Sequence, residues 1–178
     1  MNFIFKMADL FYKLAQEEQF PPDITPQLLK LFHDRTTMHI NLVKKYAGIL
    51  ESKFPELTGL SDIAAEHDAS KFGPEENLGY IRTTWSYKTT GKAAPKSVTG
   101  DSWEHHKEVN DHHPEHWGDV KEMSDLALAH AICDWAAMGE EKNTSLFEWI
   151  ENEALTRWKW SPEQIKRIYQ LAEATGKD

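Results

Sequence analysis

Apolar residues recur at steps of three and four along much of the chain, which is the spacing of one face of an α-helix. The first such run predicts a helix over residues 3–17. A second run follows Thr25 and Pro26, a pair that is typical of a helix start because threonine caps the helix and proline occupies its first position. This run predicts a long helix to about Phe54, with a break near Asp34 as an option.

Turn-forming residues divide the rest of the chain into shorter elements. We predict a turn at 55–59, a buried helix at 60–70, a helix from 74 to about 85, a loop at 88–101, and helices at 101–110, 124–139, 145–154 and 161–176. The loop combines Gly, Pro, Ser, Thr and Lys without periodicity. Because no alternating strand pattern of convincing length occurs, we predict an all-α fold. Residues 1–178 would form one compact domain of about six to eight helices, with helix 3–17 packed on it.

Composition supports a globular protein, since 40% of the 178 residues are hydrophobic. The net charge of −9 argues against broad binding to extended nucleic acid or to an anionic membrane. No stretch reaches the ~18 uncharged apolar residues of a membrane span. A single cysteine, Cys133, indicates a reducing compartment, and we expect a soluble cytoplasmic protein, with a homo-oligomer left open. Trp149, Trp158 and Trp160 are expected in the core.

Four ionisable residues interrupt predicted apolar helical faces: His39, His67, Asp68 and Asp134. Burying such a group costs several kcal/mol unless it is paired or coordinated. Singly, each has a structural explanation, such as a hydrogen-bonded core histidine or a helix end. Together they come from three separate helices, which is how helical bundles build metal sites.

The order His39, then His67-Asp68, then Asp134 resembles the H…HD…D ligand signature of the HD-domain metal-dependent phosphohydrolases, which are helical proteins. More narrowly, HDASKF, PEE, WEHHKEVNDHHPEHW and a final D-W resemble a bacteriophage and bacterial family of unknown function. A phage-encoded member would work in the host cytoplasm. The chain departs from the expected pattern at His130, where an acidic residue is expected four positions before Asp134.

The HD resemblance implies a divalent ion on His39, His67, Asp68 and Asp134. Mixed nitrogen and oxygen ligands suit Mn, Fe, Co, Ni or Zn better than Ca, and Mg is a further option.

Some HD proteins hold a second ion on two histidines between the HD pair and the last aspartate, so one or two ions are expected here. If residues 101–113 are helical, His106, Asn110 and His113 share a face. We predict His106 and His113 as the additional ligands. The alternative is that these histidines bind phosphate or orient the ligands.

Further site residues are predicted beside these ligands. Asp68, Lys71 and Glu75 are the candidate catalytic residues, with Lys71 neutralising phosphate and Glu75 or its neighbour Glu76 acting as general base or acid. A solvated lysine and an ordinary acidic first turn are the structural alternatives. The candidate substrate-binding residues are Arg35, Lys71, Asn110 and His112.

The resemblance implies a metal-dependent phosphohydrolase that acts on a nucleotide or a related small phosphate ester through a metal-activated water. The sequence contains no Walker-type glycine loop. Two alternatives stay open: a di-iron oxygenase of the HD type, and a non-catalytic phage protein that binds a nucleotide signal or a host partner.

Overall fold

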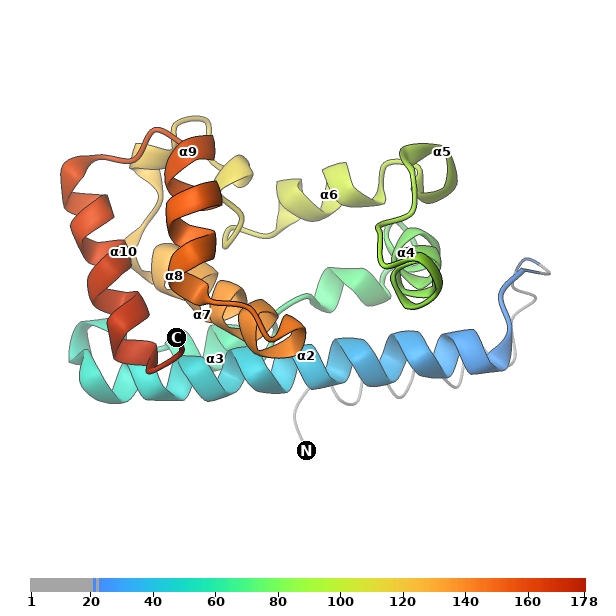
Figure 1. Cartoon of the computed structure of the whole chain (residues 1–178), viewed down its shortest axis with the longest axis horizontal. Coiled ribbons are helices and arrows are strands. Elements are labelled where there is room, and N and C mark those ends of the chain that lie inside the picture. The colour runs from blue at the N-terminus through green and yellow to red at the C-terminus, as the bar shows by residue number, and fades with distance from the viewer. Residues whose placement is uncertain (1–20, 22) are drawn as a thin grey trace. The chain divides into compact units, whose positions relative to one another are not determined.

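The structure is a computed structural model, and it describes residue 21 and residues 23–178. All regular secondary structure in this part of the chain is helical, which confirms the predicted all-α class. The helix expected at 3–17 lies outside the described residues. The elements (Figure 1) are α2 (Pro26–Lys53), η1 (Pro55–Leu57), α3 (Leu60–Ala64), η2 (Ala69–Phe72), α4 (Asn77–Thr90), α5 (Lys96–Thr99), α6 (Ser102–Val109), η3 (Pro114–His116), η4 (Val120–Glu122), α7 (Asp125–Lys142), α8 (Leu146–Trp149), the π-helix η5 (Ile150–Ala154), α9 (Leu155–Arg157) and α10 (Pro162–Thr175).

The chain forms two compact units. Of the described residues, unit 1 comprises those up to Met38 together with Asp68–Asn110, and unit 2 comprises His39–His67 and Asp111–Asp178. Helix α2 therefore contributes its residues up to Met38 to unit 1 and its residues from His39 to unit 2. The single domain expected from the chain length stays a prediction.

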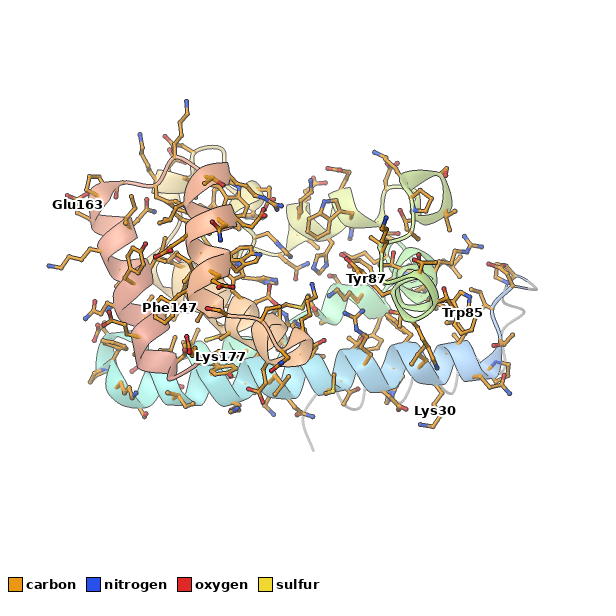
Figure 2. The ribbon with its side chains drawn as sticks, in the orientation of Figure 1. Lys30, Trp85, Tyr87, Phe147, Glu163 and Lys177 are labelled. Carbon is orange, nitrogen blue, oxygen red and sulfur yellow. The ribbon has the colours of Figure 1, made fainter. Side chains whose placement is uncertain are left out.

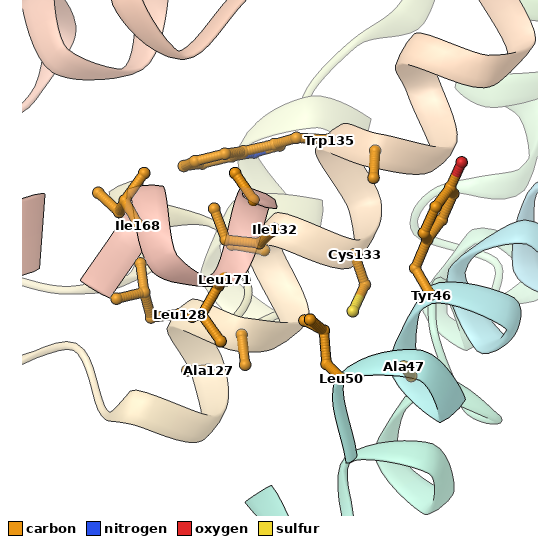
Figure 3. Packing of buried hydrophobic residues seen from close by; sticks show 14 of the residues in the cluster. Tyr46, Ala47, Leu50, Ala127, Leu128, Ile132, Cys133, Trp135, Ile168 and Leu171 are labelled. Carbon is orange, nitrogen blue, oxygen red and sulfur yellow. The ribbon is translucent and has the colours of Figure 1, made fainter. Parts of the chain in front are cut away.

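Unit 2 has a core built around α7, which packs against α3 and α10. Figure 3 shows side chains of α2, α7 and α10 together in this core, among them Leu50, Ile132 and Leu171, which are fully buried. Burying one such side chain stabilises the fold by about 1.5–3 kcal/mol. Trp160 is buried in this core, and Trp149 and Trp158 pack against it, which confirms their structural assignment.

Side-chain hydrogen bonds mark the starts of two helices, and the one at Thr25 confirms the start predicted there. Thr25 Oγ1 accepts from the Leu28 backbone N–H at 3.2 Å at the start of α2. Ser161 and Gln164 form a capping box that starts α10. Two orphan N–H groups at that helix end are satisfied in this way, so the local sequence fixes where α10 begins.

Unit 1 contains η2, α4, α5, α6 and the first half of α2. Phe32 of α2 and Phe72 of η2 pack edge to face, with ring centroids 5.6 Å apart. Helix α6 approaches α4 closely at Gly79, where an added Cβ would lie 2.0 Å from Ser102 Oγ and 2.7 Å from the Thr99 carbonyl oxygen. Only glycine permits this approach of the two helices.

Several predicted element boundaries are wrong in unit 1 and at its borders. The helix expected at 60–70 ends at Ala64, and the chain then turns until Asp68 adopts a left-handed backbone with φ 62°. The loop expected at 88–101 is shorter, because α4 continues to Thr90 and residues Lys96–Thr99 form α5. Gly91, with φ 71°, ends α4.

Other boundaries also differ from the sequence prediction. Helix α4 begins at Asn77 and not at residue 74, and α2 has no break near Asp34. Helix α7 passes Gly139 and ends at Lys142, because Asn143 takes the left-handed conformation and its N–H bonds back to the last turn. Helical periodicity was thus a better guide to these helices than the single glycine at 139.

Among the described residues, no helix is both long enough and apolar enough to cross a membrane.

Candidate metal centre

Of the four ligands that the HD resemblance implies for the first ion, three meet in unit 2. His39 comes from α2, His67 from the turn after α3, and Asp134 from α7. The Nε2 atoms of His39 and His67 are 3.1 Å apart. Asp134 Oδ1 lies 3.0 Å from His39 Nε2 and 3.8 Å from His67 Nε2. Both histidines are buried, whereas the Asp134 side chain keeps 15% of its surface exposed.

The spacing of these three atoms matches that of ligands around one ion. A transition metal about 2.1 Å from each ligand, with bond angles of about 90–110°, separates the ligand atoms by about 3.0–3.5 Å. Two of the three separations in unit 2, 3.0 and 3.1 Å, fall in this range, and the third is 3.8 Å. The His39, His67 and Asp134 side chains therefore fit a transition metal ion.

Glu141 contacts His39 on the ring nitrogen that faces away from Asp134. Its carboxylate, on the last turn of α7, accepts a hydrogen bond from His39 Nδ1–H, and its side chain is only 6% exposed. A neutral His39 then carries its lone pair on Nε2, the atom that faces Asp134. Burial raises the pKa of Asp134, but the hydrogen bond with His39 and the nearby histidines outweigh this and hold it well below its usual range. The 3.0 Å contact between His39 Nε2 and Asp134 Oδ1 therefore suits a shared proton or a cation.

Further histidines adjoin His67 in unit 2. His130 Nε2 lies 3.0 Å from His67 Nδ1, and the His112 ring lies 4.4 Å from the His67 ring. His67, His112 and His130 are all buried and offer ligand atoms within 4.8 Å of one another. Burial, followed by the neighbouring histidines, holds the pKa of His112 well below its usual range, so this ring is neutral. The half-buried His113 stacks near His112, at 4.4 Å between rings.

A second cluster lies in unit 1 and contains the fourth predicted ligand, Asp68. His106 Nε2 is 3.1 Å from Asp68 Oδ1, and His106 Nδ1 is 2.8 Å from Glu76 Oε2. His105 Nδ1 adds a contact of 2.8 Å to the other Glu76 oxygen. Burial lowers the pKa of His106, but the hydrogen bonds with Asp68 and Glu76 raise it above its usual value. The two carboxylates therefore favour the protonated form of His106.

The predicted residues Lys71 and Asn110 belong to this unit 1 cluster. The Lys71 ammonium pairs with Asp68 and lies 4.8 Å from the centre of the Tyr80 ring. The Asn110 amide donates to Ser70 Oγ at 2.9 Å and to the His106 carbonyl at 2.8 Å. The cluster thus joins the Lys71 ammonium, the His106 ring and polar groups around Asp68.

Other predicted site residues lie elsewhere. Glu75 is exposed, and its neighbour Glu76 is the glutamate that is buried against His106. Arg35 stacks over Tyr87, 5.5 Å from the ring centre, near the exposed end of α4 where Figure 2 labels Trp85 and Tyr87.

The helical face expected to join His106, Asn110 and His113 is wrong. Helix α6 ends at Val109, and Asn110 has an extended backbone with φ −116° and ψ 106°. His112 and His113 follow in a turn of unit 2 and do not continue the helix.

Two contacts were not predicted from the sequence: that of Glu141 with His39 and that of His130 with His67. A signal was available, because His130, Asp134 and Glu141 are spaced by four and seven residues and so share one face of a helix. Because Glu141 lies beyond Gly139, where the helix was expected to end, it was left out of this pattern.

The fold and the clusters define an all-helical protein with a buried histidine–carboxylate cluster in each unit. A family model described as a family of unknown function (DUF5662) matches residues 29–175, and the chain belongs to this family. Neither the curated proteins nor the solved structures contain a match. Because no function is assigned to the family, the resemblance to HD phosphohydrolases stays a prediction.

Proposed function

We propose that the protein is a metal-dependent phosphohydrolase that acts on a nucleotide or a related small phosphate ester. The metal site is proposed because His39 Nε2, His67 Nε2 and Asp134 Oδ1 lie 3.0–3.8 Å from one another in unit 2. The reaction class is supported by the H…HD…D signature of His39, His67-Asp68 and Asp134.

In this proposal His39, His67 and Asp134 hold a divalent Mn, Fe, Co, Ni or Zn ion. Such an ion supplies a Lewis acid for the phosphoryl oxygen and lowers the pKa of a coordinated water. Asp68 and Lys71 lie in unit 1, and their part in the reaction rests on the resemblance alone.

The test combines metal analysis with a screen for phosphate release. Protein reconstituted with each candidate ion is assayed on a panel of nucleotides, as wild type, as Asp134→Asn and as Asp125→Asn. Asp125 lies on the same helix but is 47% exposed and pairs with Arg167, so it is the matched control. We expect Asp134→Asn to weaken metal binding by more than about 100-fold, beyond the effect of losing an outer partner, and Asp125→Asn to match wild type.

Two results would overturn the proposal. One is a wild-type protein that retains no divalent ion after reconstitution. The other is an Asp134→Asn protein that releases phosphate at the wild-type rate. A protein that binds metal in the stated manner but turns over no phosphate ester would confine the proposal to metal binding.

A second candidate function is oxygen activation by iron. Two histidines and one carboxylate that converge on one point are the ligand set of non-haem iron oxygenases, and His39, His67 and Asp134 supply this set. Protein loaded with Fe(II) under anaerobic conditions should then consume oxygen when air is admitted. Phosphate release with Zn or Mn and no oxygen uptake with Fe would exclude this candidate.

A further inference from the structure

Helix α7 carries its buried and half-buried ionisable groups on one face. His130, Asp134 and Glu141 are separated by four and seven residues, and these spacings return to the same side of a helix. The neighbouring positions Ala131, Ile132 and Cys133 are fully buried in the apolar core of unit 2. One polar stripe on an otherwise apolar helix needs an explanation, because buried polar groups are costly unless each has a partner.

The two outer members of the stripe contact the far nitrogens of the two ligand histidines. Glu141 accepts from His39 Nδ1–H, and His130 Nε2 lies 3.0 Å from His67 Nδ1. The near nitrogens of the same rings, both Nε2, face the central member of the stripe, Asp134. Helix α7 thus presents one ligand and holds two further ligands from behind.

We infer that Glu141 is a positioning residue, which keeps His39 in the tautomer that offers Nε2 to a divalent transition metal ion. This inference rests on the proposed metal site. A carboxylate behind a ligand histidine fixes the ring orientation and makes its other nitrogen a stronger donor, because negative charge at Nδ1–H increases electron density at Nε2.

The neighbouring residue Glu140 provides the contrast that makes this testable. Its side chain is 37% exposed and accepts hydrogen bonds from Lys45 Nζ at 2.7 Å and from Tyr46 Oη. Glu140 and Glu141 therefore have the same charge and adjacent positions in the last turn of α7, but different partners. A general effect of charge on the helix end would be shared by both residues, whereas a positioning effect belongs to Glu141.

A merely structural role for Glu141 makes a different prediction. If its pair with His39 only held α2 against α7, removing it would lower the stability of the metal-free protein and leave a bound ion with unchanged ligand geometry. If it sets the tautomer, the ion itself reports the change.

The experiment is a Co(II) titration in competition with a chelator, on wild type, Glu141→Gln, Glu141→Ala and Glu140→Gln. The visible absorption of bound Co(II) reports the ligand geometry, and the unfolding temperature is measured in excess chelator. We expect Glu141→Gln to weaken Co(II) binding by about 10-fold and Glu141→Ala by up to about 100-fold. Both Glu141 variants should alter the Co(II) spectrum, and Glu140→Gln should match wild type in affinity and spectrum.

Each other outcome overturns the inference in a recognisable way. Glu141 variants with wild-type affinity and spectrum would remove the positioning role and leave the proposed metal site standing. Equal weakening by Glu140→Gln would show that the effect is one of general charge. A wild-type protein without a Co(II) spectrum would remove the metal site and this inference together. Should Glu141→Ala fail to fold, the similarly sized Glu141→Gln decides alone.

Discussion

Units 1 and 2 each hold a histidine between two carboxylates in the same orientation. In unit 1, His106 turns Nδ1 to Glu76 and Nε2 to Asp68. In unit 2, His39 turns Nδ1 to Glu141 and Nε2 to Asp134. In both units the glutamate meets Nδ1, the aspartate meets Nε2, and the aspartate belongs to the H…HD…D signature.

The two clusters differ in what else meets the aspartate. In unit 1 the Lys71 ammonium pairs with Asp68, so a permanent cation already offsets the carboxylate charge. In unit 2 Asp134 is approached by a second imidazole, His67, which offers either a proton or a lone pair. An imidazole can exchange its proton for a metal ion at neutral pH, whereas a lysine ammonium has no lone pair to offer.

A histidine between an aspartate and a glutamate can therefore belong either to an ion-paired network or to a metal site. With a lysine beside it, the arrangement of unit 1 is an ion-paired network in which the Asp68 charge is already offset. With a second histidine beside it, the arrangement of unit 2 is suited to a metal ion. The composition around the aspartate, more than the histidine–carboxylate contact itself, separates the two.

The strongest test of this difference between the units is to replace Glu76 of unit 1 and Glu141 of unit 2 by alanine, each in metal-free protein. Glu76 is fully buried and accepts from both His105 and His106, so Glu76→Ala removes the carboxylate that two histidines share. We expect it to lower the free energy of unfolding by about 3–5 kcal/mol, as for other broken buried ion pairs. Glu141→Ala should cost clearly less, because Glu141 accepts from one histidine, His39, whereas Glu76 accepts from two.

Urea unfolding in excess chelator, followed by circular dichroism, measures both variants. Glu108→Ala, an exposed change on α6, is the control for unit 1. A loss for Glu141→Ala as large as that for Glu76→Ala would show that both clusters are structural networks, and the distinction between the units would fail.

A second prediction concerns how tightly the helices that carry the unit 1 cluster are held. Gly79→Ala places a Cβ 2.0 Å from Ser102 Oγ and 2.7 Å from the Thr99 carbonyl, so backbone must move and α6 must shift from α4. We expect a loss of about 1–3 kcal/mol, the usual cost of overpacking. A Cβ added at Gly139 of α7 would lie 3.1 Å from the nearest backbone atom, the Thr144 carbonyl oxygen. Because alanine also has the higher helix propensity, Gly139→Ala should be close to neutral.

Both glycine variants are measured by thermal unfolding in excess chelator. Equal losses at the two positions would show that the close approach of α4 and α6 does not limit stability. A Gly79→Ala protein that is as stable as wild type would mean that Ser102 and Thr99 relax without cost.

The sequence predicted the helical class and much of the unit 2 cluster because both follow from one periodic pattern. His39 and Asp134 were visible as polar residues on apolar faces of long helices, and those helices formed. Glu141 was missed because Gly139 was taken as the helix end, and the capping by Asn143 two residues after Glu141 has no strong signal in a single sequence.

The unit 1 cluster was harder to predict, because it depends on contacts between short elements. Glu76 is buried against His106 in place of the predicted Glu75 because α4 starts at Asn77, three residues later than the proline at 74 indicated. Helix α6 ends at Val109, so His113 does not lie on the helix that carries His106, and no proline or glycine marks that end. Tertiary packing decides such boundaries, and periodicity over eight residues cannot.

The last and smallest prediction uses the backbone of the two aspartates. Asp68 has a left-handed backbone, with φ 62° and ψ 16°, whereas Asp134 lies inside the regular helix α7. Left-handed geometry costs a residue with a Cβ about 1 kcal/mol relative to glycine, and a helix interior favours alanine over glycine by about the same amount. Asp68→Gly should therefore be more stable than Asp68→Ala, and Asp134→Gly less stable than Asp134→Ala, each by about 1 kcal/mol.

Because each pair of variants removes the same carboxylate, the difference within a pair isolates the backbone from the loss of charge. Urea unfolding of the four proteins in excess chelator measures it. The same order at both positions would mean that Asp68 leaves the left-handed region once its carboxylate no longer binds His106 and Lys71. In that case the contacts of the unit 1 cluster hold the turn at Asp68. The reversed order would show that the turn is fixed by the chain and presents Asp68 to the cluster.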